Sequence, residues 1–292
     1  MHRHIRFAAG VLCAGLICLT TATRAAAPRC PTAGGECLVA GRIVSSEYAK
    51  LGGGIERAIV YAYPAAGGGD AVASVIGKGE HFELRLPPGD YVLRFSAVGT
   101  RGATFQGDET RLTVRPGQRP TELPTVDLPP SRTTLLFGKP APEIENAKGW
   151  KNTAPGKLAE LRGRVIVLDF FAHYCTICHM QAPELARIAA KYRGQGLAVL
   201  AVHDDSVASI EEMDQKMAKA VKLYWHGKDL AFPTVLDGGG EKGVFRAYGI
   251  GAVPALIVID KQGRLVRRFH QATDPEFEKE IQRLLAERPR QK

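Results

Sequence analysis

Two cysteines three residues apart, Cys175 and Cys178, constrain this chain more than any other feature. They follow an apolar, β-branched run at 165–168, which is typical of a strand buried on both faces of a sheet. They precede a stretch with helical spacing of apolar residues at 183–192, so we expect the pair at the start of a helix. The spacing lets the two sulfurs close a small disulfide loop, and helix N-terminal amides favour the first thiolate. The pattern predicts that Cys175 attacks a disulfide and that Cys178 resolves the mixed disulfide.

Residues 138–292 are predicted to form an α/β domain, because buried strands alternate with helices along them. Beyond the strand and helix around the cysteine pair, the pattern predicts strands at 197–202, 255–259 and 265–269 and helices at 209–221 and 276–285.

Residues 38–128 are predicted to be all-β. Apolar and polar residues alternate at 59–63, 82–86 and 91–95, and turns rich in glycine and proline separate these segments. Short strands with frequent turns favour an antiparallel β-sandwich.

The N-terminus has the order of a secretory signal: basic residues, an uncharged apolar run at 7–19, then small residues. We expect a signal peptide at 1–25 and an exported, periplasmic protein, with an uncleaved membrane anchor as the alternative. An N-terminal arm, 26–37, follows. Six prolines between 120 and 142 predict an extended path without helix, with a linker at 129–137.

The formal net charge is +9, which raises the question of nucleic acid. Removing residues 1–25 removes three arginines, and the remaining excess is scattered among acidic residues. A nucleic-acid site would be a clustered basic stripe interleaved with aromatic residues. We therefore expect no nucleic-acid partner, and a membrane contact only if the signal stays uncleaved.

Several segments resemble known families. Residues 41–44, 60–63 and 82–91 resemble the carboxypeptidase regulatory-like (transthyretin-like) β-sandwich. Residues 167–175 resemble the thioredoxin strand that leads to its active site, and residues 251–255 resemble its cis-proline loop. Three other features, 140–142, 161–164 and an insertion at 204–232, resemble the TlpA/ResA-like thiol-disulfide oxidoreductases, which are exported thioredoxin-like proteins.

This resemblance implies roles for further residues. Pro254 would be cis, the Val253 backbone would pair with the substrate chain, and Asp169 would match the buried carboxylate that accepts a proton from Cys178. It also implies protein thiols and disulfides as partners, apocytochrome c among them, and an upstream electron donor. The chain departs from the family at Gln181, where a Glu is usual, and at Asp169, where many members have Asn.

The cysteine pair also fits other kinds of site. With His179 it spells a c-type haem attachment motif, but the surrounding thioredoxin pattern favours His179 as a helix-surface residue beside the disulfide. A zinc site would need a second cysteine pair, so we expect no metal. A peroxiredoxin would need Thr three residues before its attacking Cys. A non-enzymatic scaffold is the remaining alternative, although both cysteines are present.

Cys30 and Cys37 belong to the N-terminal arm, and a structural disulfide between them is feasible after export. The alternative is a second redox pair that relays electrons to Cys178. No cofactor is expected beyond the redox-active disulfide. The direction of electron flow is left open by the sequence.

Overall fold

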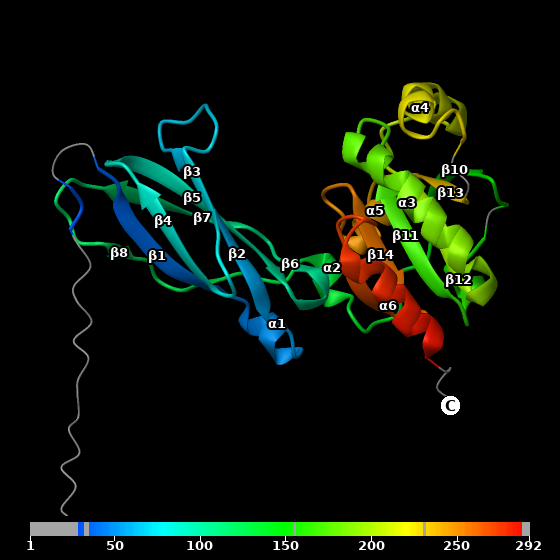
Figure 1. The fold of residues 1–292 in the computed structure, drawn as a ribbon, viewed down its shortest axis with the longest axis horizontal. Coiled ribbons are helices and arrows are strands. Elements are labelled where there is room, and N and C mark those ends of the chain that lie inside the picture. Colours follow the sequence, from blue (N-terminus) through cyan, green and yellow to red (C-terminus); the bar gives the residue numbers. More distant parts are fainter. Residues whose placement is uncertain (1–28, 32–34, 155, 230–231, 288–292) are drawn as a thin grey trace, which may run out of the picture.

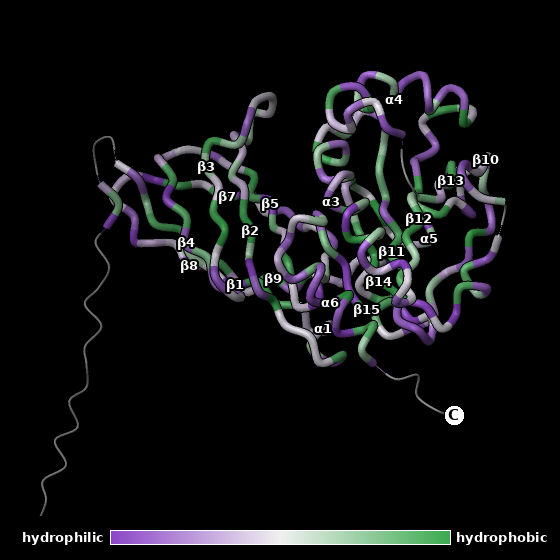
Figure 2. The backbone as a smooth tube through the Cα atoms, turned by 45° about the vertical axis from the view of Figure 1, so that its right-hand side comes forward, coloured by the Kyte–Doolittle hydropathy of each residue, from purple (hydrophilic) through white to green (hydrophobic). Residues whose placement is uncertain are grey.

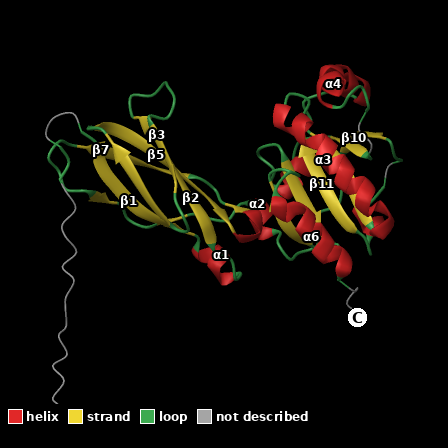
Figure 3. Cartoon of the chain, in the orientation of Figure 1, coloured by secondary structure: helices red, strands yellow, loops and turns green. Residues whose placement is uncertain are grey.

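The computed structural model describes residues 29–31, 35–154, 156–229 and 232–287. The expected signal at 1–25 lies outside them. Among the described residues, no helix has both the length and the apolar character needed to span a bilayer. Figure 1 shows an elongated chain with a β-rich lobe and an α/β lobe, and Figure 3 shows that helices are concentrated in the second lobe.

Two sheets form the β-rich lobe. One has the strand order β4-β1-β8, with β9 also paired to β1; the other has the order β3-β2-β5-β6, with β7 also paired to β5. The bounds are β1 Cys37–Val44, β2 Ile55–Pro64, β3 Ala73–Ile76, β4 His81–Leu86, β5 Gly89–Gly99, β6 Ala103–Thr104, β7 Asp108–Val114, β8 Thr121–Glu122, β9 Val126–Asp127, with helix α1 Ser46–Lys50 and the 3-10 turn η1 Thr100–Gly102.

The two sheets pack against each other through their apolar faces. The rings of Phe82 in β4 and Phe95 in β5 lie 5.9 Å apart between centroids. The alternation in β4 and β5 points the predicted apolar residues inward. In β2 the inward residues are the small Ala58, Val60 and Ala62, because the tyrosines pack outside against each other and Arg94.

One mixed sheet of order β10-β13-β12-β11-β14-β15 forms the α/β lobe. Strand β11 is parallel to β12 and antiparallel to β14, and the sheet strands are largely hydrophobic in Figure 2. The bounds are β10 Ala147–Lys151, β11 Val165–Phe171, β12 Leu197–His203, β13 Thr234–Asp237, β14 Ala255–Ile259, β15 Leu265–Phe269, α3 Thr176–Tyr192, α4 Ile210–Tyr224, α5 Val244–Tyr248, α6 Pro275–Ala286, with 3-10 turns η2 Leu158–Leu161 and η3 Arg193–Gln195. This confirms the predicted thioredoxin-like fold.

The side chains of β11 divide between two apolar clusters. Val165, Val167 and Phe171 pack with α3, α4 and α6 on one face of the sheet. Ile166, Leu168 and Phe170 face the other side, and they belong to the cluster that includes α5 and extends into the β-rich lobe. Because β11 is covered on both faces, its continuous apolar sequence is explained.

The prediction that the linker at 129–137 contains no helix is wrong for one helical turn. Helix α2, Arg132–Leu135, forms there because no proline lies between 130 and 140 and because the Ser131 hydroxyl caps the Thr134 amide. The Thr133 hydroxyl donates to the carbonyls of Tyr248 (2.7 Å) and Gly249 (3.1 Å) in the α/β lobe. Thus α2 is fixed to both lobes, since the Thr134 hydroxyl donates to Thr104 O at 2.6 Å.

We predict that residues 138–292 fold when expressed alone, because the cluster around α3 and α6 supplies a core within this segment. A matched piece starting at residue 129, which keeps α2, should be more stable by about 1–3 kcal/mol owing to the Thr133 hydrogen bonds. Urea unfolding followed by circular dichroism measures both. An unfolded shorter piece would contradict the division of the chain at residue 138.

Candidate functional site

Cys175 and Cys178 form a disulfide at the start of α3, with Cα atoms 5.3 Å apart. Cys175 is the N-cap residue, and its sulfur accepts the Cys178 N–H at 3.1 Å. Cys175 is half-buried, whereas Cys178 is buried. Tyr174 and Ile177 expose large apolar side chains around the pair. The more accessible sulfur therefore lies in an apolar surface, and a helix N-terminus stabilises its thiolate.

His203, at the end of β12, holds the loop between β11 and Cys175. Its Nε2 accepts the backbone N–H of His173 at 2.9 Å, and its Nδ1 donates to the Asp204 carbonyl at 2.8 Å. This fixes the neutral tautomer with the proton on Nδ1. Burial lowers the pKa of His203, which favours the same neutral form. The loop position thus depends on a residue on the neighbouring strand.

His179 holds the same loop from α3. Its Nε2–H donates to the His173 carbonyl at 2.8 Å, and the Trp225 indole donates to the His179 carbonyl at 2.9 Å. His179 is buried, so its expected place on the helix surface is wrong. The reason is the insertion, which folds Tyr224 and Trp225 over this side chain. Burial lowers the pKa of His179 as well.

Asp169 lies in β11 and is only 4% exposed. By strand alternation its side chain shares a face with Val167 and Phe171, which pack in the cluster that contains Cys178. Its Oδ1 has no hydrogen-bond partner among the described residues. Desolvation by this burial raises the pKa of Asp169 to about 7. A carboxyl group with that pKa can both take and return a proton near neutral pH.

A pH dependence of stability follows from Asp169. The folded pKa of Asp169, about 7, lies above the ordinary value of 3.8. The contribution of Asp169 to the free energy of unfolding is therefore complete below pH 4, where the acid is protonated in both states, and is lost as the pH rises through 7. The loss is on the order of 4 kcal/mol for such a shift. Urea unfolding of the oxidised protein from pH 4.5 to 8.5 should show the decline, and Asp169→Asn should flatten it. Equal slopes in both proteins would contradict this origin.

The bond between Val253 and Pro254 is cis. Strand β14 pairs with β11 in the register Ala255 to Phe170, so Pro254 lies beside Phe171, where the active-site loop begins. Val253 packs against the same apolar cluster as Cys175. The cis-proline loop therefore lies at the end of β11 from which the chain continues to the disulfide.

Gln181 lies one helical turn after Cys178 and is 2% exposed. Its Oε1 accepts the Ala272 N–H at 2.8 Å, whereas its Nε2 has no partner among the residues that the structure describes. Where the resembling family usually has a carboxylate, this chain has a buried amide that ties α3 to the segment before α6. Beside the apolar cluster that contains Cys178, Asp169 is thus a carboxyl group whose pKa burial has raised.

Cys30 and Cys37 also form a disulfide. Both are buried, and the Cys30 N–H donates to the Gln118 carbonyl at 2.9 Å. Cys37 starts β1, at the end of the β-rich lobe that points away from α2 in Figure 1. This position suits a structural link rather than electron relay to Cys178.

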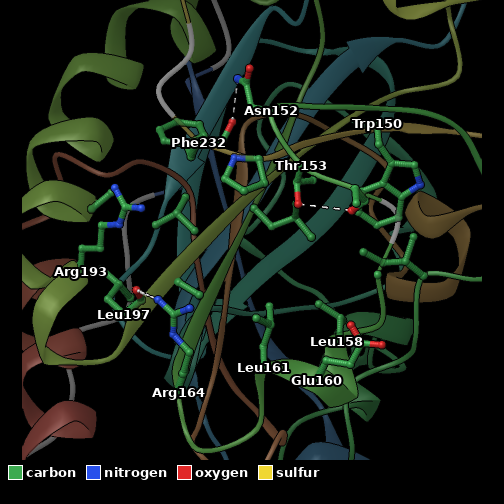
Figure 4. Close-up of a pocket in the computed structure, with 18 of the residues that line it drawn as sticks. Trp150, Asn152, Thr153, Leu158, Glu160, Leu161, Arg164, Arg193, Leu197 and Phe232 are labelled. Carbon is green, nitrogen blue, oxygen red and sulfur yellow. Dashed lines mark hydrogen bonds between the residues drawn. The ribbon is translucent and has the colours of Figure 1, made fainter.

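Two other features offer candidate sites. His173, His203 and Asp204 offer possible metal ligands within 4.8 Å of one another, but both ring nitrogens of His203 are already hydrogen-bonded. A cavity of about 620 Å³ lies between the last turns of α3 and the start of β12. Figure 4 shows Trp150, Arg164 and Arg193 among its lining residues. It lies at the opposite end of α3 from the disulfide, and neither Cys175 nor Cys178 lines it.

The fold and the disulfide at the start of α3 define an oxidoreductase of the thioredoxin-fold class. Residues 137–268 match the AhpC/TSA family. A thiol-disulfide oxidoreductase ResA of Bacillus thuringiensis subsp. konkukian is 28% identical over 137 residues, which cover 46% of this chain and 70% of the relative. ResA of Halalkalibacterium halodurans is 31% identical over 111 residues, which cover 38% of this chain and 56% of that relative. A thioredoxin-like superfamily protein of known crystal structure is 30% identical in sequence to this chain. The match covers 51% of this chain and 97% of that protein, with a TM-score of 0.42.

Sequence reasoning named both cysteines, Asp169 and the cis-proline loop, but it missed the role of His203 and misplaced His179. His203 ends a buried strand. When β12 is aligned parallel to β11, His203 lies beside Phe171, so a histidine at this position could have indicated a contact with the loop before Cys175. The signal for His179 was weaker, because its burial depends on an insertion whose path the pattern did not predict.

Proposed function

We propose that the protein is an exported thiol-disulfide oxidoreductase that exchanges disulfides with protein substrates through Cys175 and Cys178. The observation that carries this is the asymmetry of the pair: a half-buried Cys175 at a helix N-terminus and a buried Cys178 behind it. The apolar surface of Tyr174 and Ile177 fits an unfolded or extended protein substrate better than a small polar one.

In the reducing direction, the Cys175 thiolate attacks a substrate disulfide, and one substrate sulfur leaves as a thiolate. The Cys178 sulfur then attacks Cys175, which releases the second substrate sulfur. Asp169 accepts the Cys178 proton in this step. The substrate gains two electrons and two protons, and the protein ends as the disulfide. A further thiol donor must reduce it again, and no cofactor takes part. Substrates of this chemistry include apocytochrome c and other exported disulfide proteins.

Export rests on the order of basic, apolar and small residues at 1–25. We further propose that the β-rich lobe is a carboxypeptidase regulatory-like sandwich, because its two packed sheets agree with that resemblance. Its role would be placement of the redox domain or binding of a partner.

A reduction potential measured in glutathione buffers tests the proposal. We expect one two-electron transition within the range of related folds, roughly −270 to −120 mV. The reduced protein should also reduce a peptide disulfide. A pair that glutathione buffers cannot titrate, together with no peptide reduction, would contradict the function.

The haem alternative has less support. Attachment would consume both cysteine sulfurs and require the His179 ring as an iron ligand. That ring is buried, and its Nε2–H donates to the His173 carbonyl. A Soret band in the purified protein would nevertheless favour haem.

A further inference from the structure

A cluster of basic side chains lies where the two lobes meet: Arg57 in β2, Arg268 in β15 and His270 just after β15. The charges of Arg268 and Arg57 both act on His270, which places the three groups close together. Arg268 is only 8% exposed, and its guanidinium makes no hydrogen bond or ion pair with the described residues. Desolvation lowers the pKa of Arg268, and an anion beside this largely buried side chain would compensate its charge.

The cluster is joined to the redox site through the cis-proline loop. Strand β15 pairs with β14 in the register Phe269 to Leu256, which brings His270 level with Ala255. The Pro254 carbonyl acts on the His270 ring, so the ring lies near the cis-proline loop. Pro254 in turn lies beside Phe171 at the start of the active-site loop. A substrate chain lying along the cis-proline loop would therefore pass the cluster.

The β-rich lobe is held against β15, so the place of Arg57 is fixed. The turn η1 contacts β15, and Gly102 sits with its Cα against the Arg268 carbonyl oxygen, where any Cβ would clash. Gly102 also has a φ of +73°, which side chains other than glycine rarely adopt. The contact and the conformation both require glycine, and the close approach keeps Arg57 near the α/β lobe.

Other arginines at this junction are also without carboxylate partners. Arg132 donates to the Ala247 carbonyl, Arg264 donates to the Gly138 carbonyl, and Arg101 lies over the Phe137 ring at 5.0 Å. Neither these three nor Arg57 and Arg268 form an ion pair within the described ranges. Other arginines, such as Arg187 and Arg283, pair with glutamates on α3 and α6. The junction therefore carries positive charge that no ion pair among the described residues compensates.

We propose that Arg57, Arg268 and His270 form a subsite for an acidic segment, Asp or Glu side chains, that adjoins the disulfide in the protein substrate. This rests on the proposed function and adds the substrate class. It also gives the β-rich lobe a part in recognition, since Arg57 belongs to it. A carboxylate can pair with the Arg57 guanidinium in the positive field of Arg268, and charge complementarity acts mainly on selectivity and on the rate of encounter.

The test uses the full chain in its reduced form and two peptides of equal length, each with one internal disulfide. Two Glu flank the disulfide in the first peptide, and two Gln replace them in the second. At low ionic strength the wild-type protein should react about tenfold faster with the Glu peptide. Arg57→Glu should remove this preference by slowing the reaction of the Glu peptide. Arg85→Glu is the matched control, because Arg85 is an exposed arginine in β4 of the other sheet, and it should keep the preference.

Equal rates of the wild-type protein with both peptides would overturn the subsite, as would a preference that Arg57→Glu leaves intact. If instead the wild-type protein shows no peptide preference but binds phosphatidylglycerol vesicles, and Arg57→Glu does not, the cluster serves a lipid surface and the peptide proposal is wrong. Neutral hydroxyethyl disulfide separates the two levels of the argument. Reaction with it but no peptide preference rejects only the subsite, whereas no reaction with it or with either peptide rejects the proposed function.

Discussion

Replacing Cys175 with alanine is expected to lower the rate of disulfide exchange by more than about 10³-fold, as is usual when a covalent enzyme loses its nucleophile. Cys178→Ala should instead leave the first attack and accumulate mixed disulfides through Cys175. The physical reason is access: the Cys175 sulfur is half-buried at the helix N-terminus, whereas Cys178 is 4% exposed behind it. Non-reducing gels and mass spectrometry of both variants, incubated with a disulfide peptide, measure the trapped species.

The double variant Cys30→Ser, Cys37→Ser is the matched control. This disulfide lies at the end of the β-rich lobe that points away from the α/β lobe, so its loss should reduce stability without slowing exchange. Equal trapping by Cys175→Ala and Cys178→Ala would reject the assignment of roles. Loss of exchange in the double variant would instead favour an electron relay from the N-terminal arm.

Local patterns were sufficient for the elements that carry the chemistry. A continuous apolar run predicts β11 because a strand covered on both faces has no polar positions, and the same logic gives β12 and β14. The cysteine pair, its helix and the candidate base six residues earlier all follow from this stretch. Alternation also gave the β-rich lobe, although it did not reveal which face of β2 turns inward.

Contacts between distant residues were beyond such patterns. Thr133 and Tyr248 are 115 residues apart, and nothing local in either segment predicts their hydrogen bond. The same holds for His203 and His173, whose contact depends on the register of β12 against β11. The proline count predicts a boundary between two kinds of sequence, but it did not indicate the helical turn α2, because the prolines lie at the two ends of the segment and not in its middle.

Asp169→Asn is expected to slow the second step of exchange, the attack of Cys178 on the mixed disulfide, by about 10²-fold, the lower part of the range for a general base. The first attack by Cys175 should change little. In the wild-type protein, the rate of this second step should rise with pH through about 7 as Asp169 loses its proton, because burial has raised its pKa to that value. Stopped-flow measurement with a model disulfide at pH 5.5–8.5 separates the two steps, and the variant should lack the rise near 7.

Gln181 provides the competing explanation and its control. Gln181→Glu would put a carboxyl group where the resembling family usually has one, and its oxygen could keep the bond from the Ala272 amide. If Asp169 is the working base, Gln181→Glu adds little in the wild-type background, because the proton from Cys178 already has an acceptor. It should restore part of the second step only when combined with Asp169→Asn. An unchanged second step in Asp169→Asn, with Gln181→Glu alone raising the rate, would show that Asp169 is a buried acid without a catalytic role and that the chain lost its base when it acquired Gln181.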